Sequence, residues 1–253
     1  MSAFAGRSAP GDRVALVGHR GGRGPGWPPE NTLPAFARAH ADGAQAIELD
    51  VRTCAGDAVV VVHDADLARV TGGADRRTVA RLTTGELARV TIGPSGERVP
   101  TLDDVLDWAA GRVAVNVEAK HDVANRLVLA RRVARVLARH PRVEVLVSSF
   151  DPPLLAMLAV TSPRTPRAWL THDGQRAWEF LWARVAARAP IHAVHLERTQ
   201  ASRALLAALR RAGKRVGVWT VNDPAEARDL AVAGVDWVIG DDVGALKAAL
   251  SPS

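Results

Sequence analysis

The chain has almost no cysteine and no long apolar run. Cys54 is the single cysteine among 253 residues, which excludes a disulfide within the chain and favours a reducing compartment. The first twelve residues lack the apolar core of a secretory signal, and every apolar stretch is broken by charge, glycine or proline before the roughly 20 residues that span a bilayer. We therefore expect a cytoplasmic protein without a membrane span.

Aromatic residues are also scarce, at 4% of the chain, and none is interleaved with the basic residues that give a net charge of +6. The arginines are dispersed along helix-like segments such as residues 126–142, and no nucleic-acid-binding module is recognisable. We therefore expect no nucleic-acid partner. The excess positive charge still favours a small anionic substrate.

Short β-rich segments alternate along the whole chain with longer segments of helical periodicity that are rich in alanine, arginine and leucine. Hydrophobic residues make up 47% of the chain and charged residues 24%, enough apolar surface for one sizeable core. The expected strands are residues 14–18, 46–51, 58–63, 113–118, 143–148, 167–170, 192–196, 215–221 and 236–239. This pattern predicts an α/β fold, a single (β/α)₈ TIM barrel that occupies residues 1–253 with its core at about 14–250.

Nine expected strands exceed the eight places of such a barrel. Residues 52–57 are too few for a parallel crossover, which needs a dozen or more, so the second and third segments are predicted to form an antiparallel hairpin. That hairpin brings His63 back opposite residues 48–50. Residues 71–102, with several glycines and prolines, read as a small inserted connection that carries short helices.

Acidic side chains stand at the ends of two expected barrel strands. Glu48 and Asp50 are two apart, so they face the same side of their strand, and Glu118 at the end of the next barrel strand can reach the same space. Active sites of barrels lie at the C-terminal ends of the strands, and three carboxylates without thiolates suit a hard cation. We expect one divalent cation, Mg²⁺ or Ca²⁺, at these three residues.

Two histidines end strands beside that acidic cluster. His19 and His63 form a pair that can divide general-base and general-acid catalysis near neutral pH. Arg20 and Lys120 are suited to bind a phosphoryl group, although they could equally serve to neutralise the carboxylates.

Three further features carry weaker predictions. Glu30 could brace the loop of His19 and Arg20, and Asn31 or Thr32 could cap the next helix. Trp219 ends the penultimate strand, where a tryptophan is either a core residue or a wall of the substrate pocket. His192 and His195 are three apart on one strand, so they face opposite sides and are not expected to bind one metal together.

Taken with their spacing, these motifs resemble the glycerophosphodiester phosphodiesterase family. The matching segments are Gly18–His19–Arg20–Gly21–Gly22, Pro29–Glu30–Asn31–Thr32, Ile47–Glu48–Leu49–Asp50–Val51, Val61–Val62–His63–Asp64, Val117–Glu118–Ala119–Lys120, Ser148–Ser149–Phe150 and Val218–Trp219–Thr220–Val221–Asn222.

The resemblance implies an enzyme that cleaves glycerophosphodiesters to glycerol 3-phosphate and an alcohol with a divalent cation, through a cyclic phosphate. It implies that His19 and His63 are the acid/base pair and that Glu48, Asp50 and Glu118 bind the metal. Arg20 and Lys120 would contact the phosphate. It does not decide which histidine is the acid, nor the oligomeric state.

The chain departs from the family pattern at two places. Residues 23–28 lengthen the loop after the first motif, and Ile239–Gly240–Asp241–Asp242 replaces the usual Thr-Asp followed by Arg-Pro. The second departure predicts the loss of a polar contact at the last strand.

Three other functions stay open at this stage. A lysophospholipase D would use the same centre on an acylated substrate, and an apolar groove beside the site would favour it. A non-catalytic phosphodiester-binding barrel would have no need of both histidines and all three acids. A phosphosugar isomerase on the same fold would need a base placed for carbon acids.

Overall fold

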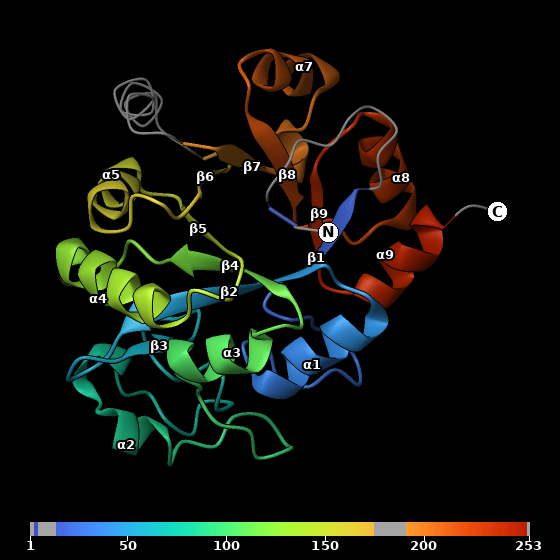
Figure 1. The fold of residues 1–253 in the computed structure, drawn as a ribbon. Coiled ribbons are helices and arrows are strands. Elements are labelled where there is room, and N and C mark those ends of the chain that lie inside the picture. The colour runs from blue at the N-terminus through green and yellow to red at the C-terminus, as the bar shows by residue number, and fades with distance from the viewer. Residues whose placement is uncertain (1–2, 5–13, 175–190, 252–253) are drawn as a thin grey trace.

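In a computed structural model of the chain, which describes residues 3–4, 14–174 and 191–251, eight parallel strands close into a barrel (Figure 1). The barrel strands follow the order β1-β9-β8-β7-β6-β5-β4-β2, and pairing of β1 with β2 closes the ring. Their bounds are β1 Ala15–Gly18, β2 Ala46–Thr53, β4 Ala114–Ala119, β5 Val145–Ser149, β6 Arg167–Thr171, β7 Ala193–Glu197, β8 Arg215–Trp219 and β9 Trp237–Gly240. The predicted TIM barrel is confirmed.

The ninth strand, β3 (Val59–Val61), lies outside the ring and pairs antiparallel with the end of β2. β1 pairs with Ala46 and Ile47 at the start of β2, and β3 pairs with residues 51–53 farther along. The predicted hairpin is therefore confirmed, and it carries His63 back toward the C-terminal ends of the barrel strands. All nine expected strands occur, with ends that differ from prediction by two residues at most.

Helices flank the barrel on the outside (Figure 1). Each α-helix in the described part of the chain begins after a Ser, Thr, Asn or Asp residue whose side chain accepts a backbone N–H of the first turn. The described helices are α1 Leu33–Asp42, η1 Val79–Arg81, α2 Thr84–Leu87, α3 Leu102–Ala109, α4 Arg126–Arg139, α5 Pro152–Thr161, η2 Arg198–Gln200, α7 Arg203–Arg211, α8 Pro224–Val232 and α9 Val243–Leu250.

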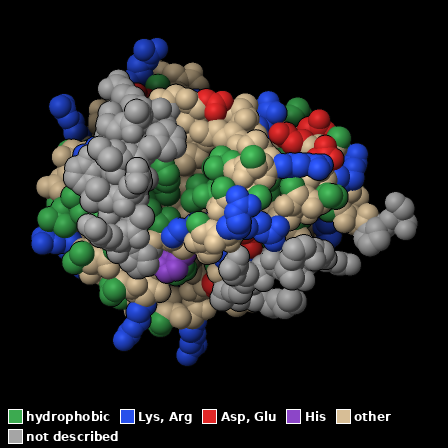
Figure 2. Space-filling view, turned by 90° about the horizontal axis from the view of Figure 1, so that it is seen from above, with side chains coloured by type: hydrophobic (Ala, Val, Ile, Leu, Met, Phe, Trp, Pro, Cys, Tyr) green, Lys and Arg blue, Asp and Glu red, His purple; other side chains and the backbone are tan. Residues whose placement is uncertain are grey.

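Helix α4 shows how the sequence pattern becomes packing. Most of its apolar residues recur at helical spacing and are buried, while Arg126, Arg131, Arg135 and Arg139 are exposed. The buried set is Leu129, Ala130, Val133, Val136 and Leu137. On the face shown in Figure 2, basic side chains are accordingly spread over several places.

The barrel interior is filled by aromatic rings and small residues at one end and lined by polar groups at the other. At the N-terminal ends of the strands, small residues such as Ala46 and Ala114 leave space that Trp237 and Phe4 fill, with ring centroids 5.6 Å apart. The Trp237 indole N–H donates to the carbonyl of Ala3 at 2.9 Å. Arg215 also reaches this end, where its guanidinium lies over the Trp237 ring at 4.1 Å. The cluster of buried carboxylates lies at the opposite, C-terminal end, where barrels place their sites.

The inserted residues 71–102 carry η1 and α2, the short helices expected there. They cover a separate apolar cluster that includes Leu67, Leu82 and Leu87. None of the described helices is both long enough and apolar enough to cross a membrane.

Candidate active site

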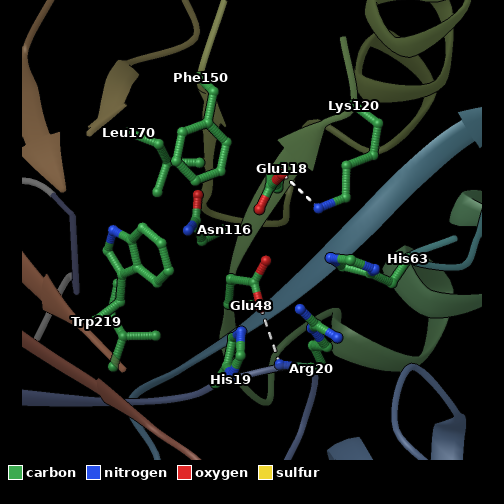
Figure 3. Close-up of a pocket in the computed structure, with 11 residues that line it drawn as sticks. His19, Arg20, Glu48, His63, Asn116, Glu118, Lys120, Phe150, Leu170 and Trp219 are labelled. Atoms are coloured by element: carbon green, nitrogen blue, oxygen red, sulfur yellow. Dashed lines mark hydrogen bonds and ion pairs between the residues drawn. The ribbon is translucent and has the colours of Figure 1, made fainter. Parts of the chain in front are cut away.

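A pocket of about 160 Å³ opens at the C-terminal ends of the barrel strands (Figure 3). It is lined by His19, Arg20, Glu48, His63, Asn116, Glu118, Lys120, Phe150, Leu170, Trp219 and Ile239. These residues come from seven of the eight barrel strands or their ends and from the end of the β2–β3 hairpin. Every residue that the sequence predicted for the site lies here, with Asp50 beside Glu48.

The three predicted metal ligands form one buried cluster. Glu48, Asp50 and Glu118 each offer a carboxylate oxygen, and these atoms lie within 4.8 Å of one another. β2 and β4 pair in a register that sets Asp50 beside Glu118, which explains why two strands can supply one site.

Two cations neutralise part of this acidic charge. The Lys120 ammonium lies 2.7 Å from Asp50 Oδ1 and 2.6 Å from Glu118 Oε1, and Arg20 Nε lies 3.3 Å from Asp50 Oδ2. This is the neutralising role that the sequence left open for both residues. Burial disfavours the ionised form of each carboxylate, but the two cations hold the pKa of Asp50 well below its usual range.

The Glu48 carboxylate is the least satisfied of the three. Its Oε2 accepts the backbone N–H of Arg20 at 2.9 Å, while its Oε1 is buried and has no hydrogen-bond partner among the described residues. Burial, together with the charges of Asp50 and Glu118, raises the pKa of Glu48 well above its usual value. A buried, unpaired carboxylate oxygen of this kind is what a bound cation would relieve.

The donor set therefore fits a hard divalent cation. All three ligands are carboxylates, and three carboxylates against two cations leave one excess negative charge, which a divalent ion converts to one excess positive charge. Such a site attracts a phosphodiester, which carries one negative charge.

His19 is held by a residue of the segment that departs from the family pattern. Its Nδ1–H donates to Asp241 Oδ1 at 2.8 Å, and Asn222 Nδ2 donates to Asp241 Oδ2, also at 2.8 Å. The expected loss of a polar contact at the last strand is wrong. Asp241 directly follows β9, so its carboxylate enters the same end of the barrel as the other acids.

His63 has the same kind of partner. Its Nδ1–H donates to Asp64 Oδ1 at 2.6 Å. For both histidines the pKa is lowered, chiefly because burial disfavours the imidazolium, while the aspartate partner opposes that effect. With Nδ1 occupied, each neutral ring presents Nε2 as an acceptor.

The segment before α1 braces the first motif. Arg20 Nη1 donates to Glu30 Oε1 at 2.9 Å, which confirms the expected role of Glu30. Thr32 caps the helix, and Asn31 instead binds Asp50 with both ends of its amide: Nδ2 donates to Asp50 Oδ2 at 2.8 Å, and Oδ1 accepts the Asp50 N–H. Asn31 has a φ of 60°, a conformation that asparagine tolerates better than most residues, and this turn aims its side chain at β2.

The far wall of the pocket is apolar and partly aromatic. Trp219 faces Phe150, with ring centroids 5.5 Å apart, and Leu170 lies beside them (Figure 3). Asn116 projects between the two walls, and both of its amide atoms are buried without a hydrogen-bond partner in the part of the chain described. Sequence reasoning did not assign Asn116, Phe150, Leu170 or Ile239 to the site. Asn116 stands two residues before Glu118 and so shares its face of β4.

His192 and His195 do not meet, as their spacing predicted. His195 is buried inside the barrel beside Trp237, whereas His192 is exposed at the start of β7 and its Nδ1 accepts the backbone N–H of Arg167. His172, which follows β6, lies against Phe150 with ring centroids 5.5 Å apart.

Comparison with known proteins identifies related sequences and structures. The chain is 28% identical over 223 residues to a glycerophosphodiester phosphodiesterase of Caldanaerobacter subterraneus, covering 85% of this chain and 89% of that protein. A crystal structure of a glycerophosphodiester phosphodiesterase from Agrobacterium tumefaciens superposes with a TM-score of 0.76 at 26% identity, covering 93% of this chain and all of that one. An Oleispira antarctica phosphodiesterase, solved with its product sn-glycerol-3-phosphate, shares the fold at a TM-score of 0.83 and 23% identity, covering 93% and 96% of the two chains.

A family model described as the glycerophosphoryl diester phosphodiesterase family matches residues 19–245, which span every residue of the pocket. The chain belongs to the glycerophosphoryl diester phosphodiesterase family.

Proposed function

We propose that the protein hydrolyses glycerophosphodiesters to glycerol 3-phosphate and an alcohol, with one divalent cation, Mg²⁺ or Ca²⁺, bound by Glu48, Asp50 and Glu118. One observation carries the proposal. Two histidines, each bonded at Nδ1 to an aspartate, line the same pocket as a buried cluster of three carboxylates.

The bound cation would offset negative charge on the phosphoryl oxygens as it builds up in the transition state. Arg20 lies beside the cluster and can add a second positive contact to the phosphoryl group. Lys120 can do the same once a cation shares the carboxylates that it now bonds.

The two histidines can then move protons in a two-step reaction. In the first step, Nε2 of one ring takes the proton of the neighbouring glycerol hydroxyl while its oxygen attacks phosphorus. The other ring, protonated, gives its Nε2 proton to the departing alcohol oxygen. The product of this step is a five-membered cyclic phosphate.

In the second step the rings exchange roles. The ring that lost a proton takes one from water as the water oxygen attacks phosphorus. The other ring returns its proton to the glycerol oxygen as the cyclic ester opens. Both histidines end in their starting states, and glycerol 3-phosphate is released.

The apolar wall supports a role for Trp219 in binding. Trp219, Phe150 and Leu170 lie opposite the charged residues, where they can contact the carbon skeleton of the substrate. The same wall favours, as a second candidate, a lysophospholipid whose acyl chain would extend over it.

The test is hydrolysis of glycerophosphocholine, glycerophosphoethanolamine and a lysophosphatidylcholine, each with Mg²⁺, Ca²⁺ or EDTA. We expect cation-dependent release of choline or ethanolamine from the glycerophosphodiesters, which EDTA abolishes. Cleavage of the lysolipid alone would support the second candidate. If no diester is cleaved with either cation, the proposal is wrong.

A further inference from the structure

A chain of ion pairs joins the two histidines outside the pocket. Asp241, the partner of His19, accepts Arg23 Nε at 2.9 Å and Arg23 Nη2 at 3.2 Å. Asp64, the partner of His63, accepts Arg69 Nε at 2.5 Å. Each imidazole is thus linked through an aspartate to an arginine.

Both arginines meet at one carboxylate. Arg69 Nη2 donates to Glu30 Oε1 at 2.9 Å, and Arg23 Nη1 lies 3.7 Å from Glu30 Oε2. Arg20 donates to the same Glu30 Oε1, so three guanidinium groups share this residue. The Glu30 side chain is 11% exposed, and Arg69 and Arg20 hold its pKa below the usual value against the effect of burial.

The two arginines are not barrel residues. Arg23 lies in the lengthened loop of residues 23–28, and Arg69 lies between β3 and η1. Their side chains are 41% and 45% exposed, and neither lines the pocket. The carboxylates that they bind are more buried, with side chains that are 11% exposed at Glu30, 12% at Asp241 and 28% at Asp64.

We propose that Glu30, Arg23 and Arg69 are positioning residues that fix the ring orientation and the Nδ1–H tautomer of His19 and His63. An aspartate held by a guanidinium has a fixed acceptor geometry, and the imidazole N–H that donates to it has one favoured direction. Glu30 couples the two halves because it binds both arginines. The catalytic role of these three residues rests on the proposed function. Their effect on the histidine tautomers does not, because the tautomers exist with or without a substrate.

The two halves are not equally supported. Asp241 also accepts Asn222 Nδ2 at 2.8 Å and donates its own N–H to Asn222 Oδ1 at 2.9 Å. Asp64 has no such amide donor among the described side chains. Apart from His63, the side chain that donates to its carboxylate is Arg69. Loss of Arg69 should therefore disturb His63 more than loss of Arg23 disturbs His19.

The test is long-range ¹H–¹⁵N correlation NMR of the full chain labelled at histidine. This experiment reports the tautomer of each ring, and it is recorded in EDTA without added metal. His19→Gln and His63→Gln spectra assign the two rings. The variants are Arg69→Ala, Arg23→Ala, Glu30→Gln and the conservative Arg69→Lys. Arg77→Ala is the matched control, because Arg77 is also exposed and paired with an aspartate, Asp75, outside this chain of contacts.

We expect Arg69→Ala to convert His63 from the Nδ1–H tautomer to a mixture while His19 is unchanged. Arg23→Ala should cause a smaller change that is confined to His19, and Glu30→Gln should affect both rings. Arg69→Lys should restore part of the His63 signal, and Arg77→Ala should change nothing. Unchanged tautomers at both histidines in Arg69→Ala and Glu30→Gln would overturn the proposal.

Kinetics give the second readout. With the glycerophosphodiester that wild type cleaves best, Arg69→Ala should lower kcat about tenfold and leave KM within about twofold, the pattern of a misplaced catalytic group. Arg23→Ala should lower kcat less. If the tautomers respond but wild type cleaves no diester, the proposed function fails and the positioning role stands.

Discussion

The two walls of the pocket differ in origin, chemistry and cost to stability. The charged wall comes from β1, β2 and β4 and from the end of the hairpin at His63, and its carboxylates are buried close together. The opposite wall comes from β5, β6, β8 and β9 and presents Phe150, Leu170, Trp219 and Ile239. The first wall is arranged for a cation and a phosphoryl group, at a cost in folding stability. The second wall stabilises the fold and can contact the carbon skeleton of a substrate.

The largest expected effect comes from removing the cation from the charged wall. EDTA, or Glu118→Gln, should lower kcat/KM by about a thousandfold, because several kcal/mol of transition-state stabilisation depend on the bound ion. Isothermal titration with Mg²⁺ and with Ca²⁺ should show binding to wild type and not to Glu118→Gln. Asp57→Asn, at an aspartate whose side chain is 85% exposed, serves as the control. An active Glu118→Gln enzyme would contradict the assignment.

Replacing either histidine should have the next largest effect. His19→Gln and His63→Gln should each lower kcat by about 10²–10⁴, the usual contribution of a general acid or base, while cation binding persists. His192→Gln is the matched control, because His192 is exposed near the opposite ends of the strands. Steady-state kinetics and cation titration together separate this loss from that of a ligand. A His19→Gln enzyme with wild-type kcat would remove His19 from the mechanism.

Substitutions in the apolar wall should change KM more than kcat. Trp219→Ala should raise KM about tenfold with a smaller change in kcat, because burying substrate carbon against one aromatic ring contributes about 1–2 kcal/mol. Trp219→Phe should retain most of the affinity. Comparing glycerophosphocholine with a lysophospholipid shows which carbon groups lie on this wall. A fall in kcat alone would indicate that the division between the walls is wrong.

Stability should change in opposite directions at the two walls. Without metal, Glu48→Gln should raise the free energy of unfolding by about 1 kcal/mol, because it removes one of three mutually repelling carboxylates and can keep the hydrogen bond from Arg20. Trp219→Ala should lower the same quantity. Urea denaturation in EDTA measures both, and a destabilised Glu48→Gln would show that the carboxylates do not repel one another in the folded protein.

An effect no larger than this is expected beneath both walls, at His195. Burial, with a further contribution from Arg215, lowers the pKa of His195 to about 3 from an unfolded value near 6.5. The folded state therefore binds fewer protons than the unfolded state between these values, so this contribution is complete above about pH 6.5 and is lost as the pH falls. We expect a loss of about 1 kcal/mol by pH 5.5, and a flatter stability curve for His195→Leu. Parallel curves for the two proteins would contradict the shift.

The sequence predicted the barrel and most of the charged wall, because both follow from local patterns. The alternation of β-rich and helical segments predicted where the strands end. Residues two apart on a strand share a face, and this rule placed Glu48, Asp50 and Glu118 together. The short connection between β2 and β3 excluded a parallel crossover and so brought His63 to the site. The resemblance to the family supplied the reaction.

Only the tertiary structure assigned the partners of these residues. Asp241 lies 222 positions after His19, and closure of the barrel between β1 and β9 brings the two together. Arg23 and Arg69 meet at Glu30 because two loops fold over the same end of the barrel. Sequence spacing determines which face of a strand a residue occupies, whereas contacts between distant segments depend on the register and closure of the sheet, which no local pattern encodes.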